Sequence, residues 1–302
     1  MSQAAIISSL EESGPLTGAE LLEKTGLEAL ELWRECAQTP RLASRVVGQR
    51  YMRLDRAVEG YARLSPSIRR EFLTYTLLDL TEQRERLSER ADRLAAEIVR
   101  ISEAKRRLAR EAITSGVAGM AERDEVAERA CFILAGDITY NMAHRVSRPE
   151  HSTGKMVRGS DLDIVIVTED DLPAATVAAL DEVIYKKKYF LLVSPSYREE
   201  IDYLIKDLAA VRRQVAFDTF ERKVACKILT EGELLYGSPR VFETVKTMLK
   251  DNGIPERLNS LESDAARNRL DGEQALREIG CAKTGADCLK LFYTTEEGDE
   301  IY

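Results

Sequence analysis

Residues 159–167 read Gly159-Ser160-Asp161-Leu162-Asp163-Ile164-Val165-Ile166-Val167, and the rest of the chain is best interpreted from this stretch. In a β-strand, side chains two positions apart point to the same face. Asp161 and Asp163 are therefore expected to project together, while the branched residues after them anchor the strand in a core. Two such carboxylates repel each other unless a cation lies between them, and their oxygens suit Mg²⁺ or Mn²⁺. The alternative is an ordinary Gly-Ser-Asp turn before a strand.

Apolar segments flank this stretch on both sides. Residues 130–136 form an apolar run, expected as a helix end or a strand, that stops at Gly136, and a short helix is expected over residues 138–146. Downstream, residues 189–193 and 201–205 are expected to be two more short strands, the second of which carries Asp202. The sequence therefore predicts a small sheet with acidic side chains at its strand starts.

This order resembles the polymerase-β-like nucleotidyltransferase superfamily over residues 126–240. The family pattern is a Gly-Ser or Gly-Gly turn, an Asp-x-Asp at a strand start and a third acid on a neighbouring strand. Residues 160–165 are similar to the middle element and residues 200–204 to the third. Residues 227–238 resemble the Gly-x-x-Leu-Tyr-Gly segment that often follows the core. One departure is Asp137, which stands after Gly136 where the family has Ser or Gly.

The resemblance implies a metal-dependent nucleotidyltransferase that moves a nucleoside monophosphate from a nucleoside triphosphate such as ATP to an acceptor hydroxyl. Asp161, Asp163 and Asp202 would be the catalytic and Mg²⁺-binding or Mn²⁺-binding acids. Glu199, Glu200 and Asp207 compete with Asp202 for the third position. Nucleotide binding would fall to a set of small and basic residues, namely Gly136, Ser160, Lys155 and Arg158.

Composition sets the background for these expectations. The chain has 302 residues, 32% of them charged, and a net charge of -8, which argues against nucleic-acid affinity through overall charge. No stretch approaches the roughly 20 apolar residues of a membrane span and no amino-terminal signal pattern is present, so we expect no membrane contact and a cytoplasmic location. The five scattered cysteines and the two histidines, His144 and His151, fit neither a disulfide framework nor a zinc site.

We expect an α/β (α+β) protein of four segments. These are a winged helix-turn-helix domain (1–65), a long helix or coiled-coil spacer (66–125), a nucleotidyltransferase-like mixed sheet flanked by helices (126–240) and a helical carboxy-terminal region with a mobile acidic tail (241–302).

The first segment resembles the general winged-helix pattern. Helices are expected over residues 4–10, 16–22 and 27–37, and residues 42–54 around Gly48 are expected to form a β-ribbon. Duplex DNA would be contacted through arginines of the third helix and the ribbon, namely Arg34, Arg41, Arg45, Arg50 and Arg53. Small winged helices also serve as protein-docking modules, which is the alternative.

The spacer carries leucine or isoleucine at strict seven-residue intervals without Gly or Pro from Pro66 to about Ser115. These positions are Leu73, Leu80, Leu87, Leu94, Ile101 and Leu108. Such heptads indicate a coiled coil, and hence a homodimer, or a long helix packed along its own chain. The companion seam mixes apolar residues with Arg84 and Lys105.

Two further features leave the function open. Lys186, Lys187 and Lys188 lie between Tyr185 and Tyr189, a combination that can hold phosphates and stack bases or simply form a solvated strand entry. Asp137 favours a rival in which the chain is a DNA-binding regulator whose transferase domain only senses nucleotides. A toxin or defence enzyme that modifies tRNA or makes a nucleotide messenger would share the transferase chemistry.

Overall fold

The computed structural model describes residues 2–150, 152–278 and 290–302. It is a mixed α/β protein, as expected, with helices around several small sheets. By its internal contacts the chain divides into two compact units. The first unit comprises Met1–Val58, Ala62–Ile98 and Glu262–Tyr302, and the second comprises Glu59–Tyr61 and Val99–Leu261. None of the helices in the described ranges is both long and apolar enough to cross a membrane.

The first unit begins with three helices and contains a three-stranded antiparallel sheet in the order β1-β5-β2, whose strand β1 lies between the first two helices, and a two-stranded sheet β3-β4. Thr17 caps the second helix by accepting a hydrogen bond from the Glu20 N–H, and the Glu20 carboxylate accepts from the Thr17 N–H. The elements are α1 (Ser2–Ser13), β1 (Leu16–Thr17), α2 (Gly18–Thr25), α3 (Ala29–Gln38), β2 (Leu42–Val46), β3 (Tyr51–Leu54), β4 (Ala62–Ser65), α4 (Ile68–Arg70), a π-helical turn (Glu71–Tyr75) and β5 (Thr76–Leu80).

The expected ribbon over residues 42–54 is wrong in its pairing. Strand β2 pairs with β5, whereas β3 pairs with β4, so the two strands around Gly48 belong to different sheets. The Val47 N–H donates to the Tyr75 carbonyl, which carries the chain away from a hairpin. The partner of β2 lies some 30 residues downstream. A pattern that spans only neighbouring residues cannot predict such a pairing.

The expected helix from Pro66 is also wrong in its first part. Leu73 lies in the π-helical turn and Leu80 in β5, and the long helix α5 spans Arg84–Ala118. Within α5, Leu87 is buried, while Ile101 and Leu108 contribute to the chain's own core. These positions therefore need no second chain to cover them, and the homodimer stays a prediction.

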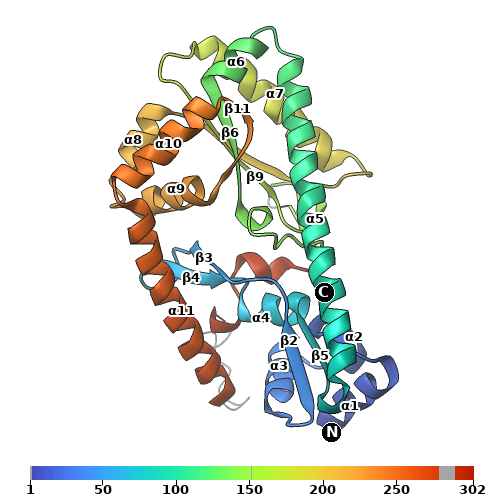
Figure 1. Ribbon diagram of the computed structural model, residues 1–302. Helices are drawn as coiled ribbons and strands as arrows, with labels where there is room; N and C mark the ends of the chain where they lie inside the picture. Colours follow the sequence, from blue (N-terminus) through green and yellow to red (C-terminus); the bar gives the residue numbers. More distant parts are fainter. Residues whose placement is uncertain (1, 151, 279–289) are drawn as a thin grey trace. The chain divides into compact units, whose positions relative to one another are not determined.

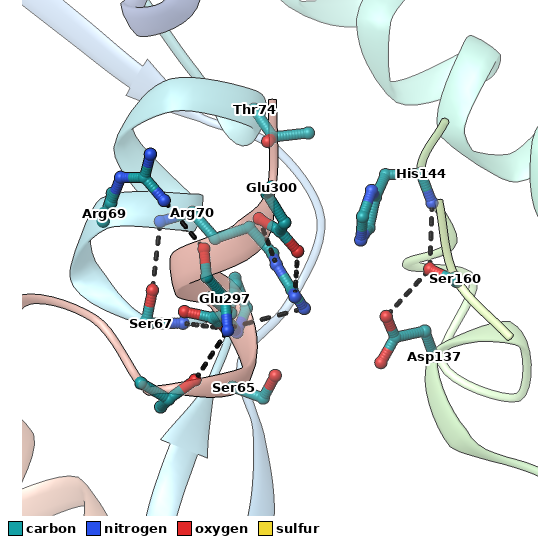
Figure 2. A network of polar contacts seen from close by, with 12 residues as sticks. Ser65, Ser67, Arg69, Arg70, Thr74, Asp137, His144, Ser160, Glu297 and Glu300 are labelled. Atoms are coloured by element: carbon teal, nitrogen blue, oxygen red, sulfur yellow. Dashed lines mark hydrogen bonds and ion pairs between the residues drawn. The ribbon is translucent and has the colours of Figure 1, made fainter. Parts of the chain in front are cut away.

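The acidic residues near the carboxyl terminus are part of the first unit rather than a mobile tail. Arg70 forms ion pairs with Glu297, at 3.5 Å, and with Glu300, and all three side chains are buried (Figure 2). Burial alone would raise the pKa of Glu297, but the Arg70 charge and a hydrogen bond from Ser67 hold that pKa below its ordinary value. A charged segment that is normally solvated is ordered here because a buried cation binds it.

The second unit is built on a four-stranded sheet in the order β10-β9-β6-β11, with β9 and β10 parallel and the other pairs antiparallel (Figure 1). One face packs on α5 and α7 through a core that includes Phe132, Ile164 and Ile184. The elements are α6 (Arg123–Arg129), β6 (Ala130–Ala135), β7 (Ser147–Pro149), β8 (Met156–Arg158), β9 (Leu162–Thr168), α7 (Ala174–Val193), β10 (Ile201–Asp207), α8 (Leu208–Gln214), α9 (Phe220–Glu231), β11 (Glu233–Gly237), α10 (Pro239–Asp251) and α11 (Ile254–Glu278).

The strands β9 and β10 match those expected at residues 162–167 and 201–205, and the apolar run at residues 130–135, expected as a helix end or a strand, is the strand β6. Two other expectations are wrong. Ile138 ends a single 3-10 turn (Gly136–Ile138) and residues 139–146 are turn and irregular backbone rather than a helix, and residues 189–193 end the helix α7 rather than forming a strand. Helix α7 contains neither Gly nor Pro, and Leu180, Ile184 and Leu191 recur on its buried face, which favours the helix over a short apolar strand.

The first prediction concerns Arg70. Replacing it (Arg70→Met) leaves two buried carboxylates without their cation, which should lower the free energy of unfolding of the first unit by about 3–5 kcal/mol. Urea unfolding monitored by circular dichroism measures the change. The matched control is Arg84→Met, because Arg84 is exposed. Adding Glu297→Gln and Glu300→Gln to Arg70→Met should restore part of the lost free energy of unfolding. If Arg70→Met alone causes no loss, Arg70 does not stabilise the first unit through these ion pairs.

Candidate functional site

Two of the predicted acids lie at equivalent positions of neighbouring parallel strands. Asp163 on β9 is the register partner of Asp202 on β10. Neighbouring strands lie about 4.8 Å apart, and register partners in a parallel pair direct their side chains to the same face. Asp161 lies directly before β9, two positions from Asp163. The sheet thus brings the three predicted acids to one edge.

Gly136 lies against the carboxylate of Asp163. Its φ is +74°, and a Cβ at this position would approach the Asp163 Oδ2 to 2.1 Å. The register partner of Asp163 on β6 is Ala135, which explains the close approach. Glycine is required here both for the positive φ and for the space. The backbone turn after β6 therefore packs directly on the Asp163 carboxylate. The predicted role of Gly136 in phosphate binding stays a prediction.

Asp137 is buried and helps to hold the loop before the predicted acids. It is 6% exposed, and its Oδ2 accepts a hydrogen bond of 2.9 Å from the Ser160 hydroxyl (Figure 2). The Ser160 Oγ in turn accepts from the His144 N–H at 3.2 Å. The Ser160 side chain, predicted to bind nucleotide, is thus buried and used to hold the loop before the acids. Asp137 meets neither Lys155 nor Arg158, and both of these residues are exposed on the β7–β8 hairpin.

Lys105 on α5 fixes the same loop. Its Nζ donates to the carbonyls of Arg158 and Ser160, each at 2.8 Å, and pairs with the Glu199 carboxylate. Burial lowers the pKa of Lys105, and burial also raises the pKa of Glu199. The sequence carried a weak signal for this residue, because Lys105 is one of two cations, with Arg84, in the companion seam of the heptads.

Arg148 on β7 supplies positive charge to the acids. Its guanidinium pairs with Asp161 and, at 3.0 Å, with Glu200. Both contacts are partly shielded from water, since the Arg148 side chain is 18% exposed. Sequence reasoning missed Arg148, because it lies 13 positions before Asp161 in an irregular stretch with no motif.

A second charged cluster lies on the other side of Gly136. The Gly136 N–H donates to Glu231 Oε1 at 3.4 Å, and the Tyr140 hydroxyl donates to Glu231 Oε2 at 2.7 Å. Lys227 pairs with Glu231 and donates to the Tyr140 oxygen at 2.7 Å. Both Lys227 and Glu231 come from α9, at the start of the segment whose resemblance was noted, but that pattern alone did not mark them as site residues.

The arginines predicted to contact DNA have other partners in the first unit. Arg34 on α3 is 5% exposed, and its Nε donates to the Leu276 carbonyl at 2.6 Å. Arg50 forms two bonds of 2.6 Å to Glu71 and pairs with Glu273 at 2.9 Å. A phosphate contact by Arg34 does not fit its position, because the end of α11 covers it.

The remaining three arginines lie nearer the surface. Arg41 pairs with Glu11 and Glu82, and Arg45 pairs with Asp92 and contacts Ser88. Arg53 on β3 is half-buried. Their exposed ion pairs are weak, so these side chains can exchange partners at small cost.

The described residues contain no ready group of three or more His, Cys, Asp or Glu side chains that could hold a metal ion. The residue types nevertheless fit Mg²⁺, because carboxylate oxygens are its usual protein ligands. Asp161 is engaged by Arg148, so binding a metal there requires that ion pair to open. Cys36, Cys131 and Cys226 are buried free thiols, whereas Cys281, Cys288 and His151 lie outside the described residues.

Comparison with protein-family models, with curated proteins and with solved structures finds no match to this chain.

The second prediction concerns Lys105. In the variant Lys105→Met the Glu199 carboxylate and two carbonyls lose a buried donor, so the second unit should lose about 3–5 kcal/mol of stability. Thermal unfolding measures the loss. Arg107→Met removes a cation from an exposed position of the same helix and should be nearly neutral. Equal effects of the two substitutions would show that Lys105 does not fix the loop.

Proposed function

We propose that the second unit is a nucleotidyltransferase that moves a nucleoside monophosphate from a nucleoside triphosphate to an acceptor hydroxyl. The observation that carries the proposal is the parallel register of Asp163 with Asp202, with the Gly136 backbone against Asp163. It supports the resemblance seen in the sequence, because the third acid falls beside the Asp-x-Asp pair although they are about 40 positions apart in the chain.

Each residue has a stated task in this proposal. Asp161 and Asp163 would hold Mg²⁺ or Mn²⁺, which supplies charge neutralisation to the triphosphate when bound. Asp202, which is exposed at the sheet edge, accepts the proton of the acceptor hydroxyl. The hydroxyl oxygen then forms a bond to the α-phosphorus, and the bond from that phosphorus to the pyrophosphate oxygen breaks.

Cations of this chain provide the electrostatic support. Lys227 lies next to Glu231 beside the Gly136 turn, and Arg148 lies next to Asp161. Each is held by a carboxylate that a bound triphosphate would compete with. The exposed Lys155 and Arg158 on the β7–β8 hairpin add positive charge near Asp161. Asp137 does not weaken the proposal, because its carboxylate is buried against Ser160.

A second candidate is the DNA-binding regulator. It is favoured by the first unit, whose three helices and β1-β5-β2 sheet order support a winged helix. Arg34 is buried and does not suit a contact with DNA, so the phosphate contacts would be made by Arg41 and Arg45.

The third prediction tests the transferase site. Asp161→Asn and Asp163→Asn should each abolish metal-dependent binding of a nucleoside triphosphate while leaving the fold intact, because Arg148 keeps its ion pair with Glu200 in Asp161→Asn and repulsion among the acids falls in Asp163→Asn. Isothermal titration with ATP, GTP, CTP and UTP in the presence of Mn²⁺ measures the binding. Asp251→Asn, an exposed acid of α10, is the control. Unchanged nucleotide binding in the double variant Asp161→Asn/Asp163→Asn would refute the site.

The fourth prediction tests the regulator. If the first unit binds duplex DNA, the affinity should fall steeply with salt, and Arg41→Ala or Arg45→Ala should each reduce the salt slope by about 0.9. Arg53→Ala serves as a comparison at a half-buried position. Fluorescence anisotropy with a labelled duplex at several salt concentrations gives the slopes. Absence of duplex binding at low salt would remove this candidate.

A further inference from the structure

The three-stranded sheet of the first unit ends in an open edge at β2. In the order β1-β5-β2, this strand has a neighbour on one side only. Hydrogen bonds of 2.9 Å flank its ladder with β5, from the Val47 N–H to the Tyr75 carbonyl and from the Thr81 N–H to the Arg41 carbonyl. Hydrogen-bonded pairs alternate along an antiparallel ladder, so the odd-numbered residues of β2 bond to β5. The even-numbered residues therefore direct their backbone groups outward.

Ser44 and Val46 carry these outward backbone groups. Both residues are exposed, and within the described part of the chain no hydrogen bond reaches the outward groups. The outward amide of Leu42 instead donates to the Thr39 carbonyl at 3.1 Å. Many proteins block such an edge with a proline or a bulge. Strand β2 contains no proline and its pairing has no bulge, so the edge is able to accept another strand.

A groove of about 510 Å³ opens beside this edge, and Ser44 and Val46 line it. Its other lining residues include Trp33 of α3, Phe72 of the π-helical turn and Leu78 of β5. These three side chains belong to the core of the first unit, so the groove has an apolar floor. Alternate side chains of a strand point to one face. Every second side chain of a strand added beside β2 would therefore enter the groove.

The charges at the groove favour an acidic ligand. Arg50 and Arg277 both line it, and their side chains are 34% and 53% exposed. The carboxylates that they contact, Glu71 and Glu273, are only 9% and 14% exposed. Arg277 lies 4.0 Å from Glu273, and its guanidinium lies 5.7 Å from the centre of the Trp33 ring. The cations thus face solvent while the acids lie deeper, and the groove presents positive charge.

We propose that the β2 edge and this groove bind an extended acidic peptide of a partner protein, which adds a strand to the sheet. The backbone groups of Ser44 and Val46 hydrogen-bond to the peptide backbone, as in other cases of strand addition. Apolar side chains of the peptide enter the groove beside Trp33, and an acidic side chain pairs with Arg277. The site lies within the first unit, so the inference does not rest on the proposed transferase function.

A second copy of this chain fits the edge less well. Two β2 strands that paired antiparallel through Ser44 and Val46 would place Arg45 of one copy directly opposite Arg45 of the other. Like charges directly opposite each other destabilise a strand pair. Arg45 is also bound to Asp92 of α5, at 2.9 Å, on the face of β2 away from the groove. An acidic strand has no such repulsion, which favours a partner of opposite charge.

The test uses the full chain as bait for a display library of peptides of about six residues, a typical strand length, in which Val, Ile, Phe or Tyr alternates with Glu or Thr. We expect peptides that contain Glu to be retained. The best of them is synthesised with blocked ends, and its binding is measured by fluorescence. Trp33 is the only tryptophan of the chain, so its emission reports on the groove. Retention of no peptide at low salt would overturn the proposal.

N-methylation of the selected peptide distinguishes strand addition from other binding modes. Methyl groups on the amides that face β2 should abolish binding, whereas methyl groups on the amides between them should leave binding nearly unchanged. The reason is that only every second amide of a strand faces its neighbour. This measurement leaves the chain unaltered and is independent of the folding of any variant. Equal effects of the two methylated sets would show that the peptide is not bound as a strand and would overturn the proposal.

Variants of the chain locate the peptide at β2. Val46→Pro removes an outward N–H that the ladder with β5 does not use, and proline is tolerated at such edge positions. Peptide binding should fall about tenfold in this variant because a backbone hydrogen bond is lost. Val46→Ile keeps the amide and an apolar side chain and should bind like the unmodified chain. Equal binding by all three chains would overturn the proposal, and circular dichroism checks that Val46→Pro folds.

A charge exchange tests the acidic character of the peptide. Arg277→Glu should weaken binding of the Glu-containing peptide, and replacing that Glu of the peptide by Lys should restore binding to Arg277→Glu. If the Lys peptide binds no better to Arg277→Glu than to the unmodified chain, the acidic partner is wrong.

Sedimentation of the chain without peptide tests the competing occupant. We expect Val46→Pro to leave the oligomeric state unchanged. A dimer that dissociates on this substitution would show that a second copy occupies the β2 edge, and it would also overturn the proposal.

Discussion

The second unit depends on one buried cation. Lys105 reaches from α5 into the loop before β9 and satisfies two backbone carbonyls and a carboxylate. Loops carry backbone polar groups that must find partners when buried. Without this ammonium, the turn that aims Asp161 and Asp163 would have to hydrate or rearrange. The long helix is thus a structural support for the acids as well as a connection between segments of the chain.

The acids and their neighbours form a balanced set of charges. Two carboxylates about 5 Å apart repel by roughly 3 kcal/mol at an effective dielectric constant of 20, so a cluster of acids needs compensation. Arg148 provides it at Asp161, and Lys227 provides it at Glu231. In the proposed reaction, a bound triphosphate would compete with each of these carboxylates for its cation. The ion pairs therefore fix the side chains of the site. A charged ligand can still replace one partner of each pair.

Sequence reasoning reached β9 and β10 as strands and β6 as an apolar run because these signals are local, and it missed β11. The apolar runs that end at Gly136 and follow Asp163 are continuous, so they mark buried segments without the need of a distant partner. It failed where a distant partner decides the structure. β2 pairs with β5 rather than with its neighbour in sequence, and Leu73 and Leu80 fit a heptad yet belong to other elements. The contacts of Arg148 and Glu231 could not be predicted from the sequence. They arise from three-dimensional proximity to Asp161 and Gly136, and neither residue belongs to a recognised motif.

The Arg70 cluster ties the beginning of the chain to residues 230 positions later. During synthesis, domains generally fold as units once their residues are available. The first unit includes residues from both ends of the sequence, so it cannot bury Arg70 until residue 300 has left the ribosome, by which time the whole second unit has been made. A nascent chain interrupted before that point carries an uncompensated cation in an unfinished core. A stable first unit therefore requires that residues 297–300 have been made, and products that end before them are exposed to proteolysis.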